Sequence, residues 1–357
     1  MADDDTDETT GDEDAKSEGI HGDDLAAVER LQKGYKSLRD ELGKVIVGQE
    51  QVLEELLISI FARGHCLLIG VPGLAKTLMI STLAQTLSLN FSRIQFTPDL
   101  MPADIVGTTI VVESESGGRE FQFRKGPIFA QLVLADEVNR ATPKTQSAML
   151  EAMQEHRVTA GRTSYILPQP FCVLATQNPI EQEGTYPLPE AQLDRFLFKL
   201  VVRYSSRAEL SEIIDRTTGK DTPKPQKVMT GEEIVEWRKL VRELVVAEHV
   251  KDFAIRLVLA THPKGEYAVD MTNQYVSFGA SPRGVQSLIL AAKFRALLDG
   301  RWNVAFSDIR NAALPALRHR ILLNFEGEAD GMTSDEVVAA ILDNVDNTIK
   351  GEALQRV

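Results

Sequence analysis

The chain has 357 residues, 43% of them hydrophobic, which is long enough for two domains with a sizeable core and too apolar for a chain disordered throughout. Its net charge of −13 is concentrated near the start, because residues 1–24 hold eleven acids and one lysine (−10), leaving 41 acids and 38 bases (−3) elsewhere. This balance argues against a broadly basic nucleic-acid-binding body, although a local basic patch stays open. We predict that 1–24 is an acidic disordered tail that serves solubility or binds a basic partner.

The first residues lack the basic and apolar segments of a signal peptide, and no run approaches eighteen apolar residues. We therefore expect a cytoplasmic protein without membrane insertion. Cys66 and Cys172 lie in apolar, strand-like runs, where free buried thiols are common. The six histidines show no paired ligand spacing on one helix face, which disfavours a metal held by the protein alone.

Two helices are expected first. Apolar residues at near-helical spacing predict a helix over 25–42, with Gly43 as its cap, and a second helix over 50–62. The short apolar cluster between them contains Val47 and Gly48. It is either core or one wall of a slot for an adenine base.

A strand, a glycine-containing loop and a helix follow. An apolar run over 65–69 precedes Gly-Val-Pro-Gly-Leu-Ala-Lys-Thr at 70–77, and a helix-like segment continues to about Leu89. The loop fits the phosphate-binding pattern G-x-x-x-x-G-K-[ST] except for Ala75 at the second glycine. In such a loop the backbone amides, the helix N-terminus and Lys76 attract phosphate, and Thr77 would supply a hydroxyl to Mg²⁺. Because a Cβ is costly at positive φ, we expect ordinary helical angles at Ala75. The candidate nucleotide-binding residues are Val47, Gly48, Gly70, Pro72, Gly73, Leu74, Ala75, Lys76, Thr77 and Leu78.

A hairpin interrupts the alternation of strands and helices. Residues 91–96 predict a second strand, and 108–113 and 119–124 are alternating segments joined by a Ser/Gly-rich turn at 114–118. Gly126-Pro127 is expected to restart a helix. The apolar strand after it ends in Asp136 and Glu137. At the carboxyl end of a parallel strand, Asp136 can hold water of a Mg²⁺ shell and Glu137 can polarise an attacking water.

The next elements are a helix over 143–155, a second hairpin over 157–167 and a buried strand over 171–178. Asn178, at the end of this strand, either orients the attacking water or is a turn residue before Pro179. A short helix over 190–196 and a strand through Val202 complete five strand-like runs alternating with helices. This pattern predicts a parallel sheet covered on both faces.

The chain changes character after a proline-containing linker candidate at 221–227, and 228–357 has mainly helical spacing. We place an α/β nucleotide-binding core at 25–205 and a helical lid domain at 206–357. Ser281-Pro282 opens one helix and Gly300 closes it. Arg283 lies in the first turn, where a cation opposes the helix dipole, so its position suggests a role beyond local stability.

Taken jointly, these motifs resemble the MoxR family of AAA+ ATPases. The resemblance rests on the motifs at 70–77, 134–141 (Leu-Ala-Asp-Glu-Val-Asn-Arg-Ala), 175–181 (Ala-Thr-Gln-Asn-Pro-Ile-Glu), 193–196 (Leu-Asp-Arg-Phe) and 281–284 (Ser-Pro-Arg-Gly). It implies a P-loop core with a five-stranded parallel sheet, two inserted hairpins and a small all-α lid.

The resemblance also implies roles for single residues. Asp136 and Glu137 would be the Walker B pair, Asn178 sensor 1, and Arg283 sensor 2. Arg195 would be the arginine finger that reaches the γ-phosphate of a neighbouring subunit. Arg140 and Arg157 are rivals of Arg195 for this role.

An arginine supplied in trans requires a ring or open helix of protomers, so we expect a homo-oligomer, a hexamer in the first instance. The cofactors would be ATP and Mg²⁺, since no guanine-specific Asn-Lys-x-Asp motif is present. The family also suggests a von Willebrand factor A domain protein and its client as partners, remodelled by a chaperone-like activity. The loop at 102–107 lacks the aromatic residue of a threading pore loop. A nucleic-acid motor and a nucleotide-gated scaffold with negligible turnover remain as alternatives; the few basic residues in the hairpins give the motor little support.

Overall fold

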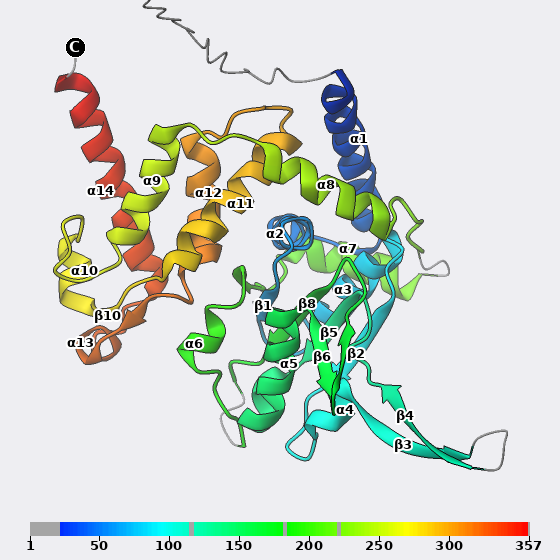
Figure 1. Ribbon diagram of the computed structural model, residues 1–357. Helices are drawn as coiled ribbons and strands as arrows, with labels where there is room; N and C mark the ends of the chain where they lie inside the picture. Colours follow the sequence, from blue (N-terminus) through cyan, green and yellow to red (C-terminus); the bar gives the residue numbers. More distant parts are fainter. Residues whose placement is uncertain (1–21, 114–117, 181–183, 220–222, 356–357) are drawn as a thin grey trace, which may run out of the picture.

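The computed structural model describes residues 22–113, 118–180, 184–219 and 223–355. At its centre is a five-stranded parallel sheet in the order β2-β5-β8-β1-β9 (Figure 1). The strands are β1 (Cys66–Ile69), β2 (Phe91–Gln95), β5 (Leu132–Asp136), β8 (Cys172–Gln177) and β9 (Phe198–Val201). The prediction of five parallel strands is thus confirmed.

Both faces of the sheet are buried, which explains why its strands are almost continuously apolar. Successive residues point to opposite faces, so Leu134 and Leu174, which are paired in register, join one hydrophobic cluster, while Val133 and Val173 join the other. On the first face pack α2 (Glu50–Phe61) and α3 (Lys76–Thr86); on the second packs α5 (Pro143–Glu155).

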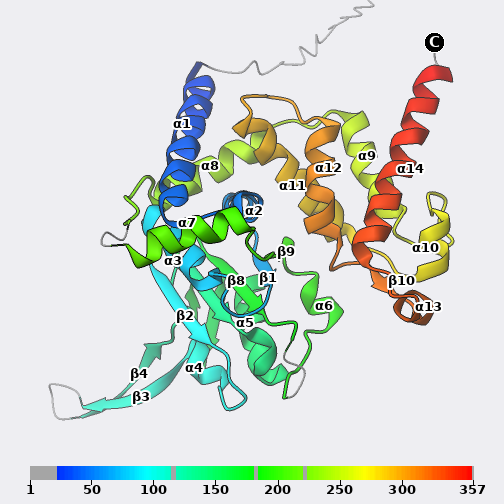
Figure 2. The same ribbon diagram turned by 180° about the vertical axis from the view of Figure 1, so that it is seen from behind.

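The first of these clusters also extends into the helical part of the chain. α1 (Gly22–Val45) contacts both α3 and α11 (Pro282–Leu298), and Phe61 on α2 stacks against Phe294 on α11 at a centroid distance of 5.0 Å. The remaining helices of this part lie to one side of the sheet (Figures 1 and 2). They are α8 (Gly231–Glu243), α9 (Glu248–Leu259), α10 (Asp270–Tyr275), α12 (Phe306–Leu317), α13 (Phe325–Ala329) and α14 (Ser334–Gln355), with the short strands β10 (Val276–Phe278) and β11 (Leu322–Leu323).

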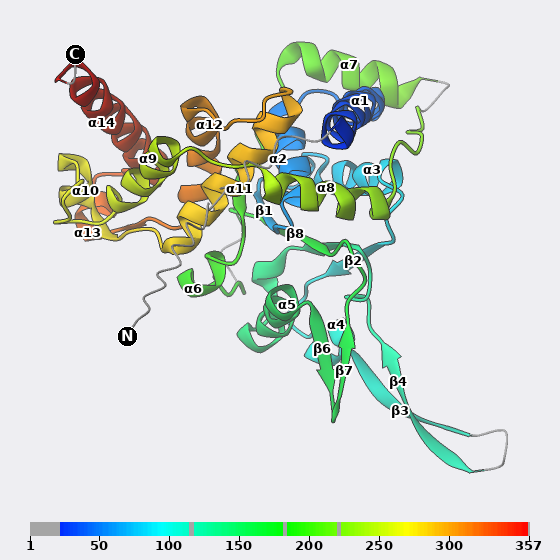
Figure 3. The same ribbon diagram turned by 45° about the horizontal axis from the view of Figure 1, so that its top comes forward.

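Two hairpins leave the same side of the core (Figure 3). They are β3 (Gly107–Glu113) with β4 (Arg119–Lys125), and β6 (Arg157–Ala160) with β7 (Thr163–Ile166). The stem of the first is fixed by Gly107, at φ 105°, and Gly126, where an added Cβ would lie 2.3 Å from the Ile105 oxygen. The first hairpin is preceded by the short helix α4 (Pro102–Val106). Both hairpins are where the sequence predicted them, although turn residues 114–117 lie outside the described residues.

Two local predictions are wrong. Gly43 does not cap α1, which continues to Val45 because Leu42 and Ile46 are buried beneath it. Gly126-Pro127 forms a turn instead of a helix, since Gly126 is pressed against the backbone of α4. The predicted boundary between 205 and 206 falls between β9 and α7 (Arg207–Thr218), and the linker candidate lies partly outside the described residues. In the part that the structure describes, no helix is long and apolar enough to cross a membrane.

Candidate functional site

The loop at 70–77 joins the end of β1 to the start of α3 and corrects one expectation. Ala75 has φ 55° and ψ 19°, in the left-handed region, and Gly73 has φ 87°. Our expectation of helical angles at Ala75 is therefore wrong. The loop keeps the turn that a glycine would make there, and a Cβ in this region costs about 1–2 kcal/mol.

Lys76 lies inside this loop. Its Nζ donates hydrogen bonds to the carbonyl oxygens of Val71, at 2.8 Å, and Gly70. Burial lowers the pKa of Lys76, while the nearby charges of Asp136 and Glu137 raise it. The loop carbonyls and the two carboxylates compensate the charge of Lys76. Lys76 can exchange these partners for phosphate oxygens at a small cost in free energy.

A cavity of about 330 Å³ collects most of the predicted residues. It is lined by Pro72, Gly73, Leu74, Ala75, Lys76, Thr77, Leu78, Asp136, Glu137, Thr176 and Asn178. The parallel sheet explains this assembly, because β1, β5 and β8 are neighbours and all end at this edge. The volume falls within the range of small-molecule sites.

Asp136, at the end of β5, is held by two side chains that the sequence did not single out. Thr176 Oγ1 donates to Asp136 Oδ1 at 2.6 Å, and Arg93 Nη2 donates to Oδ2 at 2.7 Å. Both carboxylate oxygens are therefore engaged, which suits an indirect contact with a metal through water. Thr77 and Asp136 offer only oxygen ligands to the cavity, and oxygen is what Mg²⁺ prefers. Among the described residues no group of three His, Cys, Asp or Glu side chains is placed to hold a metal ion.

Glu137 is oriented by its backbone and by two hydrogen bonds. It has φ 57°, and its amide donates to Thr176 Oγ1 at 2.9 Å. Its Oε2 accepts from Gln95 Nε2 at 2.7 Å and from Arg140 Nη1 at 3.1 Å. Arg140 thus contacts a carboxylate of its own chain, and Arg157 pairs with Glu155 at 3.2 Å. The sequence analysis did not identify Gln95 as a site residue. The only indication in the sequence was that Gln95 lies two residues after Arg93 on β2, so that both side chains are on the same face of the strand.

Asn178 follows β8 and is 5% exposed. Its Oδ1 accepts from the Ile180 amide at 3.2 Å, so it caps the turn before the next segment as well as lining the cavity. Both roles considered for Asn178 are compatible with this position.

Val47 and Gly48 do not line the phosphate-loop cavity. Gly48 lines a different cavity, and a Cβ added to it would lie 2.3 Å from Glu209 Oε1 on α7. Gln49 Nε2 donates to the Arg203 carbonyl at 2.8 Å, which also holds this loop against the segment before α7. A role for Val47 and Gly48 in holding a base stays a prediction.

Arg195 and Arg283 come together, but away from the phosphate loop. Both line a cavity of about 200 Å³ that contains none of the residues 70–78. Arg283 Nη1 lies 3.2 Å from Asp194 Oδ2, and Arg320 Nε donates to Asp194 Oδ1 at 2.8 Å. Arg195 Nη1 donates to the Leu150 carbonyl at 2.9 Å.

Asp194 and Arg320 are further residues that the sequence analysis missed. Ser281 Oγ also donates to Asp194, at 2.9 Å, so this carboxylate ties the start of α11 to the end of α6 (Glu190–Leu193). Burial lowers the pKa of Arg320, and its charge is compensated mainly by Asp194. Four arginines, Arg63, Arg195, Arg283 and Arg320, line this cavity together with one carboxylate, Asp194, and leave it positively charged.

Comparisons with known proteins agree with this geometry. Residues 65–198 match the model of the ATPase family associated with various cellular activities (AAA), and residues 269–341 match the AAA lid domain. The chain is 43% identical over 305 residues to Chaperone MoxR1 of Mycobacterium tuberculosis, covering 85% of this chain and 80% of that protein. It is 30% identical over 299 residues to Protein MoxR of Methylorubrum extorquens, covering 79% and 86%.

A solved structure is also similar. The crystal structure of a candidate ATPase from Cytophaga hutchinsonii superposes with a TM-score of 0.83 at 43% identity, covering 89% of this chain and 96% of that one.

Proposed function

The chain belongs to the MoxR family of AAA+ ATPases, and we propose on this premise that it hydrolyses ATP between neighbouring copies of itself in order to remodel a protein partner. It is an ATPase with an AAA core and an AAA lid. The observation that carries the proposal is that Arg195 and Arg283 line a cavity of their own and do not line the phosphate-loop cavity of the same chain.

Within one protomer, the loop at 70–77 would bind the phosphates. Lys76 would move from the Gly70 and Val71 carbonyls to phosphate oxygens. Glu137 would accept a proton from the attacking water, and Asn178 would orient that water. Mg²⁺ bound with ATP would neutralise phosphate charge, held by Thr77 and, through water, by Asp136.

The second half of the site would come from the next protomer. Arg195 and Arg283 line one positively charged cavity, and a fixed guanidinium charge stabilises a departing phosphoryl group. Sensor 2 would then act on the same neighbour as the arginine finger. Such a head-to-tail contact repeats until it closes into a ring or continues as an open helix. We keep a ring, a hexamer, as the proposed state and the cytoplasm as its location.

The hairpins support a protein partner. Val111 on β3 and Phe121 on β4 are directly paired, and their side chains are 55% and 79% exposed. At the base of the hairpins Phe123 stacks on Tyr165 of β7 at 4.5 Å, which joins the two hairpins into one arm. Exposed apolar pairs of this kind are found at interaction sites.

Retention of a partner by an ATP-locked variant tests this proposal. Glu137→Gln should bind ATP without turnover, and the trapped form should retain a von Willebrand factor A domain protein in ATP and release it in ADP. Phe121→Ser should lose this retention and keep basal turnover, while Phe325→Ser, an equally exposed aromatic at 86%, should keep both. Retention that ignores the nucleotide would contradict the proposal.

Two other functions give different results in the same assays. Stimulation of phosphate release by single-stranded DNA, lost at high salt, would favour a nucleic-acid motor. Nucleotide binding without steady-state phosphate release would favour a scaffold, but Glu137 lies in the phosphate-loop cavity as hydrolysis needs.

A further inference from the structure

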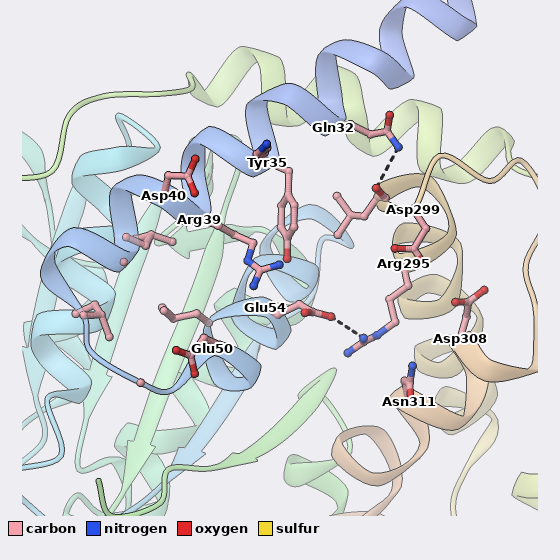
Figure 4. A pocket seen from close by; sticks show the side chains of 17 residues that line it. Gln32, Tyr35, Arg39, Asp40, Glu50, Glu54, Arg295, Asp299, Asp308 and Asn311 are labelled. Carbon is pink, nitrogen blue, oxygen red and sulfur yellow. Dashed lines mark hydrogen bonds and ion pairs between the residues drawn. The ribbon is translucent and has the colours of Figure 1, made fainter. Parts of the chain in front are cut away.

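The cavity that Gly48 lines is distinct from the phosphate-loop cavity and from the cavity that Arg195 and Arg283 line. It has a volume of about 620 Å³ and lies between α1, the start of α2, and the adjoining ends of α11 and α12 (Figure 4). None of the residues 70–78 lines it. Its volume is that of sites for metabolite-sized molecules.

A buried hydroxyl without a partner points into this cavity. Tyr35 on α1 is 9% exposed, and its ring is fixed edge-on against Phe294 at 6.4 Å. Its hydroxyl finds no hydrogen-bond partner among the described residues, and neither does Nε of Arg295 on α11. Burial, and next the charge of Glu54, raises the pKa of Tyr35, so its hydroxyl stays protonated and is a donor. Buried polar groups are normally satisfied, so an unpaired donor leaves room for an acceptor, either water or a ligand.

The unpaired donors around this hydroxyl suit an anionic ligand. Figure 4 shows the Arg39 guanidinium beside the Tyr35 hydroxyl, and among the described residues no hydrogen bond or ion pair engages Arg39. Arg295 Nη1 donates to Glu54 Oε1 at 2.6 Å and leaves its Nε unpaired. Five carboxylates line this cavity: Glu54 pairs with Arg295, Asp299 and Asp308 pair with Arg301, and Asp40 and Glu50 lie at its edge. Arg39 and the Tyr35 hydroxyl therefore keep donors that one more anionic group could accept.

Two acidic residues at the mouth of the cavity limit how many negative charges a ligand can carry. Asp40 and Glu50 are exposed at its edge, where they disfavour a polyanion and can accept hydrogen bonds from hydroxyl or amino groups. We propose that this cavity binds a small organic molecule with one anionic head, a phosphate monoester or a carboxylate, placed between Arg39 and Arg295 and accepting a hydrogen bond from Tyr35.

Such a ligand would bridge α1 and the α11–α12 pair. Gln32 Nε2 on α1 donates to the Leu298 carbonyl on α11 at 3.1 Å, and it is one of the few direct links across the cavity. A molecule in the cavity would add contacts between α1 and the α11–α12 pair and would restrict movement of the lid. ATP turnover should then change when the ligand binds.

Calorimetric titration of the full chain tests the site. The Lys76→Ala variant is the background, since it removes phosphate binding at the loop, and the probes are ribose 5-phosphate, gluconate and inorganic phosphate. At least one organic probe should bind saturably. Ribose 5-phosphate alone would identify the head as a phosphate monoester, and gluconate alone as a carboxylate.

Two substitutions locate the binding. Tyr35→Phe, which keeps the buried ring, should weaken the bound probe at least fivefold, and Arg39→Gln at least tenfold. Tyr204→Phe, at an exposed tyrosine, should change nothing. Both cavity variants should keep the basal ATPase rate in the otherwise native chain. Equal affinity in Arg39→Gln, competition by ATP, or no saturable binding of any organic probe would overturn the proposal.

Discussion

Gln95 Nε2 donates a 2.7 Å hydrogen bond to Glu137 Oε2, so the proposed catalytic carboxylate is held by a side chain from the neighbouring strand β2. We predict that Glu137 releases Gln95 when it acts on the attacking water, while Arg140 still donates to the same oxygen at 3.1 Å. Removal of the hydrogen bond should therefore favour the reactive orientation.

Gln95→Leu should raise the basal turnover number two- to tenfold and leave KM for ATP nearly unchanged, because a hydrogen bond of this kind has a net value of about 0.5–1.5 kcal/mol. Steady-state phosphate release measures both constants. Gln122→Leu, at an exposed position on β4, is the control. A fall in turnover would mean that Gln95 assists the reaction instead.

Thr176 is expected to matter for both stability and turnover. Its hydroxyl donates to Asp136 and accepts from the Glu137 amide, and it is 1% exposed. Thr176→Val keeps the shape but leaves that amide without an acceptor, so the free energy of unfolding should fall by about 1–3 kcal/mol and turnover should drop. Urea denaturation and phosphate release check this. Thr176→Ser should retain both properties, and equal behaviour of the two variants would contradict the role of the hydroxyl.

The left-handed backbone angles of Ala75 lead to a prediction about the phosphate loop. Its left-handed angles are easier for glycine, but glycine also gains freedom in the unfolded chain, about 0.4–1 kcal/mol. Ala75→Gly should thus leave ATP affinity intact and change stability by no more than about 1 kcal/mol, whereas Ala75→Val should lose affinity. Nucleotide titration with denaturation curves distinguishes these cases. Full affinity in Ala75→Val would show that these angles are not needed for binding.

Mixing two inactive variants tests the site between subunits. Arg195→Ala keeps its phosphate loop, and Lys76→Ala keeps its arginines, so each alone should be inactive. If the arginine acts on a neighbour, random co-assembly restores about a quarter of the interfaces. Arg283→Ala should complement Lys76→Ala in the same way, and Arg162→Ala should remain active on its own. Mixtures as inactive as their components would place the arginines in the site of their own chain.

Acid should destabilise the protein through two buried histidines. Burial, and then the charge of His156, lowers the pKa of His65 to about 3, and burial with Arg320 lowers the pKa of His319 well below its usual value. Below a pH of about 6.5 both histidines bind protons in the unfolded chain but stay neutral in the folded chain. Stability is therefore complete above a pH of about 6.5 and falls by about 1.4 kcal/mol per pH unit for each histidine below it. Urea denaturation at pH 7.5, 6.5 and 5.5 measures this slope, and equal stabilities at pH 7.5 and 5.5 would exclude it.

The sequence was most informative where one face or both faces of an element are buried. The strand that ends at Asp136 and the strand that ends just before Asn178 begin with continuous apolar runs, and the buried residues of α5 have helical spacing. All three elements were therefore predicted with nearly correct ends. The phosphate loop was predicted from its glycines and lysine. Each of these patterns lies within a short stretch of the sequence, so it can be recognised without knowledge of the fold.

Contacts between distant segments could not be predicted in this way. Arg93 and Gln95 reach the site only because β2 lies beside β5, and strand order is a property of the whole sheet. Gly43 stays helical because tertiary packing overrides its weak helix propensity, and Ala75 is left-handed because the loop requires it. Asp194 was missed since its three partners come from a different part of the chain.

The stem of the β3–β4 hairpin has a consequence for how this protein diverges. Gly107 and Gly126 are confined by neighbouring backbone atoms, whereas most side chains beyond them are exposed. Mutations in the hairpin therefore disturb the packed interior little, whereas mutations at its two anchoring glycines disturb it strongly. If this arm binds the partner, as proposed, evolution can change which protein is recognised without altering the residues of the hydrolytic site.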